Sequence, residues 1–465
     1  MARVAAQLTN FTAGELSPRL DGRVDLAKYP AGCATVENMV IYPHGAAARR
    51  PGTQYIAPVK TSSAKTRLIP FEFSTTQTYI LELGNQYIRF FRDNGQILSG
   101  GSPYEISSPY LTAELFDIKF AQSADVMYIT HPNHKTRKLS RTGHTSWSLT
   151  EVEFTNGPFL DTNTSTTTLT ASGVSGSVTI TASSSTFVST DVGRQVRIGS
   201  GHSKITAFGS ATSVTVTTTT NFPNTNASTD WSLGAFSTTT GHPSCVSFFE
   251  QRLVFAATLN NPQTVYFSKS GDYENMDANI GGTVADDDAI IYTIASNQVN
   301  AIRFMAASRT LIIGTAGGEF TVSGGGDNDA VTPTNVMIKK QSNHGAANVD
   351  AIAVGNATLF LQRAKRKIRE LAYNFDVDGY IAPDMTILAE HVTEGGLTQI
   401  AYQQEPNQII YAVRNDGELV ALTYQREQQV TAWHRHIFGG RFGNATVTVT
   451  DFANIANGTR IVLTK

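Results

Sequence analysis

The chain has 465 residues, 40% of them hydrophobic and only 16% charged, and its formal net charge at pH 7 is −2. This length is roughly three times the ~150 residues typical of one domain, so more than one core can be buried. A near-neutral chain lacks the basic field that holds nucleic acid by its phosphates, which excludes a DNA-coating role. Gly, Ser, Thr and aromatic residues take the place of the missing charges, a profile typical of short strands and tight turns.

Cysteine content and hydropathy exclude two further classes. Cys33 and Cys245 are too few for a disulfide scaffold and neither lies in a CxxC motif, so we expect two buried, unreactive thiols in a reducing compartment. No segment reaches the ~18 apolar residues of a membrane span, and the first ten residues lack the apolar core of a signal peptide. The sequence therefore predicts a protein with no membrane span that is not exported by the general route.

The first 60 residues form a poorly apolar, turn-rich segment. Its glycines let the chain bend, and its arginines offer forked donors for carboxylates. Because this segment has too little apolar content to fold alone, we expect an extended arm that packs across a neighbouring subunit and is ordered by it. The candidate interface residues of the arm are Arg19, Asp21, Arg23, Arg49 and Arg50.

A repeat with a period of roughly 50 residues runs through residues 61–160 and again through residues 241–440. Each unit has one apolar strand and then two strands joined by a tight turn. Such units bury their apolar faces only by stacking or by closing into a ring. We therefore predict an all-β, β-propeller-like body of about six to seven units, two in the first range and four in the second. A β-sandwich array with accidental spacing is the alternative. Isoleucines at matching positions in the units are Ile69, Ile118, Ile302, Ile352 and Ile400.

Two regions break this repeat. Residues 161–240 contain 37 Ser or Thr among 80 positions, and their alternating apolar residues favour strands over a disordered linker, so we predict an inserted small β-barrel or Ig-like module. Residues 441–465 form a partial last unit. In that unit 459–465 matches the first strand of a hairpin without a partner strand. Either the chain stops inside a seventh unit or the N-terminal segment supplies the missing strand.

The usual catalytic motifs are absent from the sequence, including GxSxG, HExxH and the P-loop. Four histidines occur in close pairs, but zinc needs three or four converging ligands, so we expect them to be ordinary surface or turn residues. Two acidic loops, Asp286–Asp288 and Asp376–Asp378, have the chemistry to hold calcium, although Asp-Gly is also plain turn chemistry. The paired histidines are His131 with His134 and His434 with His436.

One strongly basic run lies at the expected hairpin tip of the fifth unit. It is either a solvated tip that blocks edge pairing or a contact for an acidic partner ring or passing DNA phosphates. The candidate interface residues of this run are Arg363, Lys365, Arg366 and Lys367.

The arm resembles the opening of the nozzle proteins, or tail tubular protein B, of short-tailed bacteriophages and related prophages. The resemblance rests on Gly-Glu-Leu-Ser-Pro-Arg-Leu at 14–20, Asp-Gly-Arg at 21–23, Lys-Tyr at 28–29 and Arg-Arg-Pro-Gly-Thr at 49–53, and it extends into 69–91 and 248–273. The N-terminal pattern is fairly specific and the repeat match is generic. Together they cover most of the chain outside 161–240.

The resemblance implies a structural virion subunit that is not an enzyme and needs no cofactor. Such a subunit is assembled in the host cytoplasm as a homo-oligomeric, six-fold ring below the adaptor near the portal. Genomic DNA leaves through the lumen without tight binding, and tail fibres dock on the ring. Related proteins usually continue past residues 433–438, so a distal tip segment is expected either here or in another protein.

A second class of function fits the same fold, a carbohydrate-binding or polysaccharide-degrading propeller acting on host surface glycans. Aromatic residues on its strands would stack sugars, although strand aromatics usually fill a core. Catalysis would require a carboxylate pair at ~5–9.5 Å, for which Glu250, Asp272, Glu274 and Glu319 are candidates. The stacking candidates are Tyr266, Phe267, Tyr273 and Tyr292.

Overall fold

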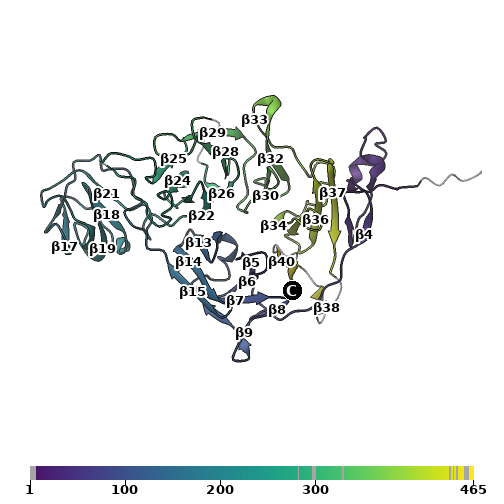
Figure 1. The fold of residues 1–465 in the computed structure, drawn as a ribbon, viewed down its shortest axis with the longest axis horizontal. Helices are drawn as coiled ribbons and strands as arrows, with labels where there is room; N and C mark the ends of the chain where they lie inside the picture. Colours follow the sequence, from purple (N-terminus) through teal and green to yellow (C-terminus); the bar gives the residue numbers. More distant parts are fainter. Residues whose placement is uncertain are drawn as a thin grey trace, which may run out of the picture.

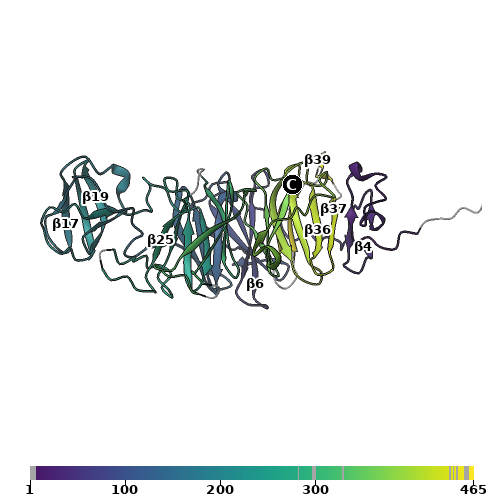
Figure 2. The same ribbon diagram turned by 90° about the horizontal axis from the view of Figure 1, so that it is seen from above.

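The computed structural model describes residues 7–280, 282–295, 300–326 and 329–438, and four short stretches beyond them, 441–442, 445–446, 449–454 and 460–464. Within these residues the regular structure consists of strands and five short 3₁₀ helices. Six blades, each of four antiparallel strands, stand around a ring, which is seen face-on in Figure 1 and as a flat slab in Figure 2. This six-bladed β-propeller confirms the body predicted from the 50-residue repeat. No described helix has the length and apolar character needed to cross a membrane.

The first three blades lie on the N-terminal side of residue 300, with the insert between blades two and three. A strand β8 (Gly95–Gln96) adds to β7 of blade one, and a small hairpin, β9 (Leu98–Ser99) and β10 (Ser102–Pro103), follows it. The helix η3 (Leu115–Asp117) leads into blade two. The blade strands are β5 (Arg67–Glu72), β6 (Thr78–Gly84), β7 (Tyr87–Arg92) and β11 (Glu105–Ser107); β12 (Lys119–Ser123), β13 (Val126–His131), β14 (His134–Gly143) and β15 (Ser146–Glu151); and β22 (Cys245–Phe249), β23 (Arg252–Ala256), β24 (Thr264–Phe267) and β25 (Ile290–Thr293).

Blades four to six repeat the same order of strands, and the helix η5 (Phe375–Val377) lies between the last two strands of blade five. Their strands are β26 (Ile302–Ala307), β27 (Leu311–Thr315), β28 (Gly318–Ser323) and β29 (Met337–Ser342); β30 (Ile352–Val354), β31 (Ala357–Leu361), β32 (Ile368–Asn374) and β33 (Gly379–Ile381); and β34 (Leu397–Gln403), β35 (Ile409–Arg414), β36 (Leu419–Gln425) and β37 (Val430–His436).

Apolar side chains between neighbouring blades form the core. The first strands of adjacent blades contact one another, as β12 does β22 and β22 does β26, so these strands line the axis. Middle strands such as β6 and β23 are buried along their whole length because a blade covers each of their faces. Several clusters of buried side chains each span two neighbouring blades. Examples of residues from successive blades in one cluster are Phe71 with Met127, Tyr128 with Phe255, Val265 with Ile313, Phe304 with Phe360, and Leu359 with Ile410.

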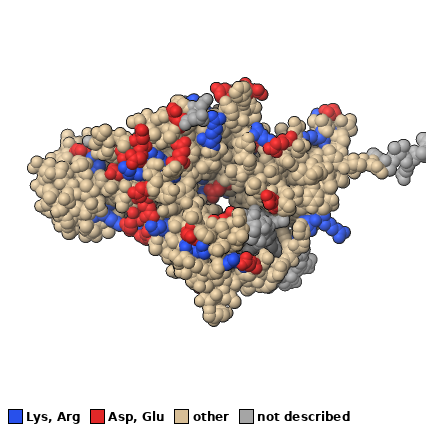
Figure 3. Space-filling view, viewed as in Figure 1, with Lys and Arg blue, Asp and Glu red and all other residues tan. Residues whose placement is uncertain are grey.

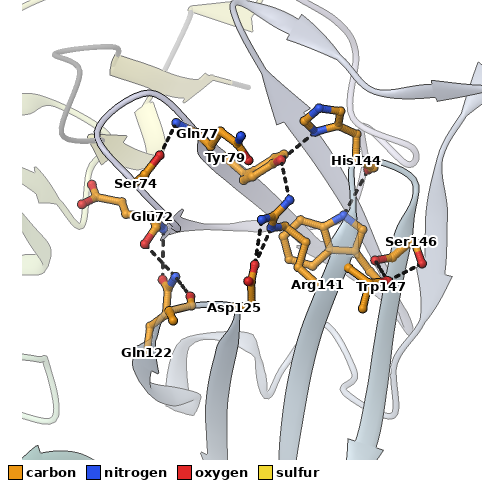
Figure 4. A network of polar contacts seen from close by, with 12 residues as sticks. Glu72, Ser74, Gln77, Tyr79, Gln122, Asp125, Arg141, His144, Ser146 and Trp147 are labelled. Atoms are coloured by element: carbon orange, nitrogen blue, oxygen red, sulfur yellow. Dashed lines mark hydrogen bonds and ion pairs between the residues drawn. The ribbon is translucent and has the colours of Figure 1, made fainter.

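Polar side chains also fasten blade one to blade two (Figure 4). The Gln122 amide on β12 accepts the N–H of Glu72 on β5 at 3.0 Å and donates to its carbonyl at 2.9 Å. Arg141 pairs with Asp125 at 2.7 Å and donates to the Tyr79 hydroxyl at 3.3 Å. These contacts give polar groups of both blades partners where water is excluded.

The ring is closed by a C-terminal hairpin of β40 (Val449–Asn454) and β41 (Arg460–Thr464). β40 contacts β34 and β35 of blade six on one side and β5 of blade one on the other. The buried Asp451 carboxylate accepts the backbone N–H of Leu68 on β5. The expectation that 459–465 is a first strand without a partner is wrong, because the less apolar 449–454 precedes it as its partner. A second short pair, β38 (Arg441–Phe442) and β39 (Ala445–Thr446), lies between β37 and this hairpin in the sequence.

Contacts across the ring bridge the propeller axis. Asp350, just before blade five, accepts from the Lys119 ammonium of blade two at 2.9 Å and lies 4.0 Å from the Arg67 guanidinium of blade one. The Asn348 amide donates to Asp117 at 2.9 Å. Side chains of blades one and two and of the segment before blade five therefore meet across the ring.

The insert is one six-stranded antiparallel sheet, in the order β16-β17-β20-β19-β18-β21. It curves around a core that includes Ile180, Val196 and Val216, and its two ends meet where Leu169 and Ser228 exchange backbone hydrogen bonds at 2.9 Å. It is barrel-like, and the Ig-like alternative does not apply to its described residues. The elements of the insert are β16 (Leu169–Ala171), β17 (Ser177–Ala182), η4 (Ser189–Asp191), β18 (Gln195–Ile198), β19 (Gly201–Ser210), β20 (Ser213–Thr220) and β21 (Trp231–Leu233).

Excision of the insert tests its independence. The chain enters and leaves it side by side, since the Leu160 N–H donates to the Leu233 carbonyl at 2.9 Å and the Ala235 N–H to the Pro158 carbonyl at 2.7 Å. Replacing residues 161–233 with two glycines should leave a soluble chain with one cooperative thermal transition, measured by circular dichroism and gel filtration. Insoluble or non-cooperative protein would show that the propeller needs the insert.

Buried neutral histidines predict loss of stability in acid. Burial, with the nearby Lys135 and His134 charges, lowers the pKa of His242 from 6.5 to about 4. The unfolded chain binds this proton first, so the contribution is present above about pH 6.5 and is lost as the pH falls toward about 4. The melting temperature of the wild type should therefore fall toward that of His242→Gln across this window. A difference between the two melting temperatures that does not change with pH would contradict this assignment.

Candidate functional site

The N-terminal arm packs on the outer edge of blade six of its own chain (Figure 1, purple beside β37). Its strand β1 (Gly14–Glu15) runs parallel to β37 and to β2 (Gly32–Cys33). The expectation that neighbouring subunits order the arm is therefore corrected, because its own blade six does so. The remaining arm elements are η1 (Pro18–Leu20), η2 (Tyr29–Ala31), β3 (Met39–Ile41) and β4 (Ala47–Arg49).

Gly14 and Leu16 fix how closely the arm approaches the blade. A Cβ on Gly14 would lie 2.4 Å from the backbone nitrogen of Trp433, and its φ of +66° is one that other residues rarely adopt. Leu16 is buried against Gly32, where a Cβ would meet its side chain at 2.2 Å. Only glycine fits at both positions without moving the arm away from its neighbours.

Glu15 is a fully buried charge at the centre of this contact. Its carboxylate accepts the Val36 N–H at 2.8 Å, lies 2.9 Å from the Arg435 guanidinium and 2.8 Å from Nε2 of His391. A buried carboxylate is tolerated only when such partners replace water, so its geometry specifies one position of the arm. Beside it, burial and the Glu15 charge raise the pKa of Cys33. We expected both thiols to be buried; Cys245 is buried, whereas Cys33 is only half-buried.

Ser17 and Arg19 join the arm to the segment after blade five. The Ser17 N–H donates to the Leu388 carbonyl at 2.8 Å, and its hydroxyl donates to Glu390 at 2.8 Å. Arg19 lies 3.4 Å from Glu390 and its side chain is 83% exposed. This pair is worth little to stability in water, so Arg19 remains available to a partner.

The other predicted arm residues divide into two kinds. Arg23 forms a bidentate surface pair with Asp25 at 2.7 Å, and Asp21 and Arg49 are exposed. Arg50 instead fastens the arm to the end of blade six. It donates to the Asn38 side chain at 3.0 Å and the Ile437 carbonyl at 3.2 Å, with its guanidinium 4.7 Å from the centre of the Phe438 ring. Arg50 is therefore a structural residue of this chain.

The basic run forms the β31–β32 turn of blade five. Arg363, Arg366 and Lys367 are exposed there, and Lys365 takes a left-handed φ of +61°. Arg366 lies 3.3 Å from Glu394, and Lys367 lies 2.7 Å from Asp384. Acidic neighbours therefore already balance part of this charge.

The arm and this turn meet in one groove of about 560 Å³. Arg19 contributes from the arm, Arg366 and Lys367 from the turn, and Ile387, which is 68% exposed, from the segment after blade five. The acidic walls are Asp384 and Glu390. Charges of both signs are mixed over the face shown in Figure 3, with no basic track. An apolar patch with mixed charges suits a protein partner better than DNA phosphates.

Neither acidic loop gathers metal ligands in the described part of the chain. Asp287 and Asp288 pair with Lys269 at 3.4 and 2.7 Å. Asp378 accepts from the Tyr373 hydroxyl at 2.8 Å in a left-handed turn. Asp376 donates its backbone N–H to Asn374 there. Both are local loop contacts.

The prediction of surface or turn histidines is wrong for two of the four, His434 and His436, since His131 and His134 flank the β13–β14 turn. His131, His434 and His436 are buried, and the last two share a hydrogen bond of 2.9 Å. His434 and His436 follow Val430 and Ala432 at every second position of β37, on the face that packs against the arm, and this period of two could have revealed their burial.

The residues of the glycan hypothesis do not form an open sugar platform. Tyr266 and Phe267 are buried in the core of blade three. Glu319 is buried and accepts from Ser342, and burial raises its pKa; Glu274 pairs with Lys138 at 2.6 Å. Glu250 accepts from the Val331 N–H, Asp272 lies in the turn after β24, Tyr273 packs on Phe248, and Tyr292 is partly exposed on β25.

The structure thus defines the chain as a six-bladed β-propeller with an inserted barrel and an edge-packed arm. No protein-family model and no curated protein matches the sequence. Solved structures that match include YCF48 bound to a D1 peptide, at 10% identity over 86% of this chain and 89% of that one with a TM-score of 0.39. Others are the Neurospora crassa Pan2 WD40 domain (9%, 74% and 84%, TM-score 0.33) and a Lactobacillus plantarum protein (10%, 86% and 95%, TM-score 0.35). These likenesses concern the fold alone.

Replacing Gly14 by alanine should release the arm. The Cβ would overlap the backbone at Trp433, and we expect a cost of about 1–3 kcal/mol, seen as a lower melting temperature and faster proteolysis within residues 7–60. Gly22→Ala is the matched control, because Gly22 also has a positive φ, +80°, but nothing lies within 4 Å of its added Cβ. Equal behaviour of the two variants would contradict the close-approach argument.

Proposed function

We propose that this chain is a structural subunit of the tail of a short-tailed bacteriophage. In this role it is a nozzle protein that forms a homo-oligomeric ring below the adaptor, gives ejected DNA a passage and docks tail fibres. The proposal assigns it no catalysis and no cofactor, and places it in the virion tail after assembly in the host cytoplasm.

The observation that carries the proposal is the structural role of the Gly-Glu-Leu-Ser pattern at 14–17. Each of these four residues has its own physical requirement, namely close approach, a buried ion pair, packing and a hydrogen bond. The pattern that carries the family resemblance is thus the part of the arm whose residue types are constrained by its packing on blade six. This supports shared architecture over chance similarity.

The remaining contacts of such a subunit have candidate surfaces on this chain. The groove of Arg19, Arg366, Lys367 and Ile387 is suited to an acidic and apolar partner such as the adaptor or a second copy. The inserted barrel projects from the opposite end of the long axis, where a fibre has access (Figure 1). Because Asp350 bridges the propeller axis, the DNA passage belongs to the lumen between subunits, whose near-neutral wall would not retain phosphates.

Charge reversal in the groove tests this assignment. In particles assembled from a phage genome that lacks its own copy, the Arg19→Glu, Arg366→Glu chain should lower the yield of complete tails roughly tenfold or more, because like charges then face the partner. Lys339→Glu, an exposed cation on β29 of blade four, is the control and should assemble normally.

Circular dichroism and melting temperature must match the wild type for both proteins. A normal yield of complete tails with the groove variant would show that the groove makes no assembly contact. Absence of the wild-type chain from purified particles would overturn the tail assignment itself.

A further inference from the structure

Three side chains with metal-binding chemistry meet at one end of blade two, outside the arm and its groove. His131 ends β13 and His134 begins β14, and the two residues pair directly across the two-residue turn. Directly paired residues point to the same face of a hairpin, with Cβ atoms about 4.5–5.5 Å apart. Glu114, from the segment before η3, lies on them, with its carboxylate 2.9 Å from Nε2 of His134. One ligand atom from each of the three lies within 4.8 Å of the others.

Burial provides an independent sign of a missing ligand. His131 is only 1% exposed, and its Nε2 has no hydrogen-bond partner among the described residues. The buried hydroxyl of Tyr110, whose ring lies edge-on to His134 at 5.2 Å, has none there either. Both of these unpaired atoms belong to residues whose rings contact His134, which points to a ligand at this cluster that the described residues do not supply.

We propose that Glu114, His131 and His134 bind a zinc ion, with water in a fourth position. Two imidazoles and one carboxylate form a donor set that zinc accepts, whereas calcium and magnesium prefer oxygen ligands. Coordination through Nε2 of His134 replaces its 2.9 Å hydrogen bond to Glu114 and moves the proton of that neutral ring to Nδ1. Coordination through Nε2 of His131 moves that ring's proton to Nδ1 and gives up the 3.2 Å contact with the Asn133 N–H.

The position of the ion gives it a structural role. It would tie the connection between blades one and two to the β13–β14 turn, whose Pro132 carbonyl accepts the His242 N–H at 3.1 Å. His242 lies on the segment that leaves the inserted barrel. The ion would therefore stabilise the root of the insert as well as the junction of two blades.

Titration of the full-length chain tests the site. After removal of metals with a chelator, zinc chloride should bind with one-to-one stoichiometry by calorimetry and raise the melting temperature, since a ligand of the folded state alone stabilises it. Cobalt(II) should give the visible absorption of a low-symmetry nitrogen and oxygen site. Glu114→Gln and His134→Gln should each weaken zinc binding roughly tenfold or more. Glu114→Gln keeps an acceptor for the Leu111 N–H, so it is the variant expected to fold normally.

His44→Gln, at an exposed histidine of the arm, is the matched control and should bind zinc as the wild type does. The assignment would be overturned by no binding to the wild type, by binding that His44→Gln abolishes, or by unchanged affinity in both site variants.

Discussion

A propeller blade is apolar on both faces, so it is stable only between two neighbours, and the whole structure depends on closing the ring. This chain closes it with both of its ends. The C-terminal β40 fills the space between blades six and one, and Val449 packs there with Val40 of the arm and Tyr411 of blade six. The arm has little apolar content of its own, and it is ordered because residues such as Val40 complete a core that blade six already provides.

The buried Glu15 determines where the arm lies. An ion pair of this kind adds little net stability over an apolar contact, but it strongly disfavours any position in which the carboxylate loses Arg435 and His391. The same placement carries Arg19 to the edge of the basic turn of blade five. A single buried charge thus couples the fold of the arm to the composition of the surface proposed for assembly.

The sequence was sufficient to predict the first three strands of every blade, because the second strand is an apolar run buried on both faces and the first and third strands flank it closely in the sequence. The fourth strands were not predicted, and β29 shows one reason, since it reads as polar and carries Lys339 and Lys340, both exposed. In the groove, the arginines of the arm and of the turn were each identified, but their meeting depends on the packing of blade six against blade five. Glu114 was missed for the same reason, because only the path of η3 brings it to the histidine turn. Patterns along the chain reveal elements, whereas contacts between distant elements require the folded ring.

The central claim is that this propeller is one subunit of a tail ring. Electron cryomicroscopy of the tail of purified particles tests it most directly. The account predicts density for this chain as a closed, six-fold ring below the adaptor, with the groove of Arg19 and Arg366 covered by a partner and the DNA passage between subunits. Particles whose tail density has no place for this propeller, or in which DNA density runs through the propeller axis bridged by Asp350, would contradict it.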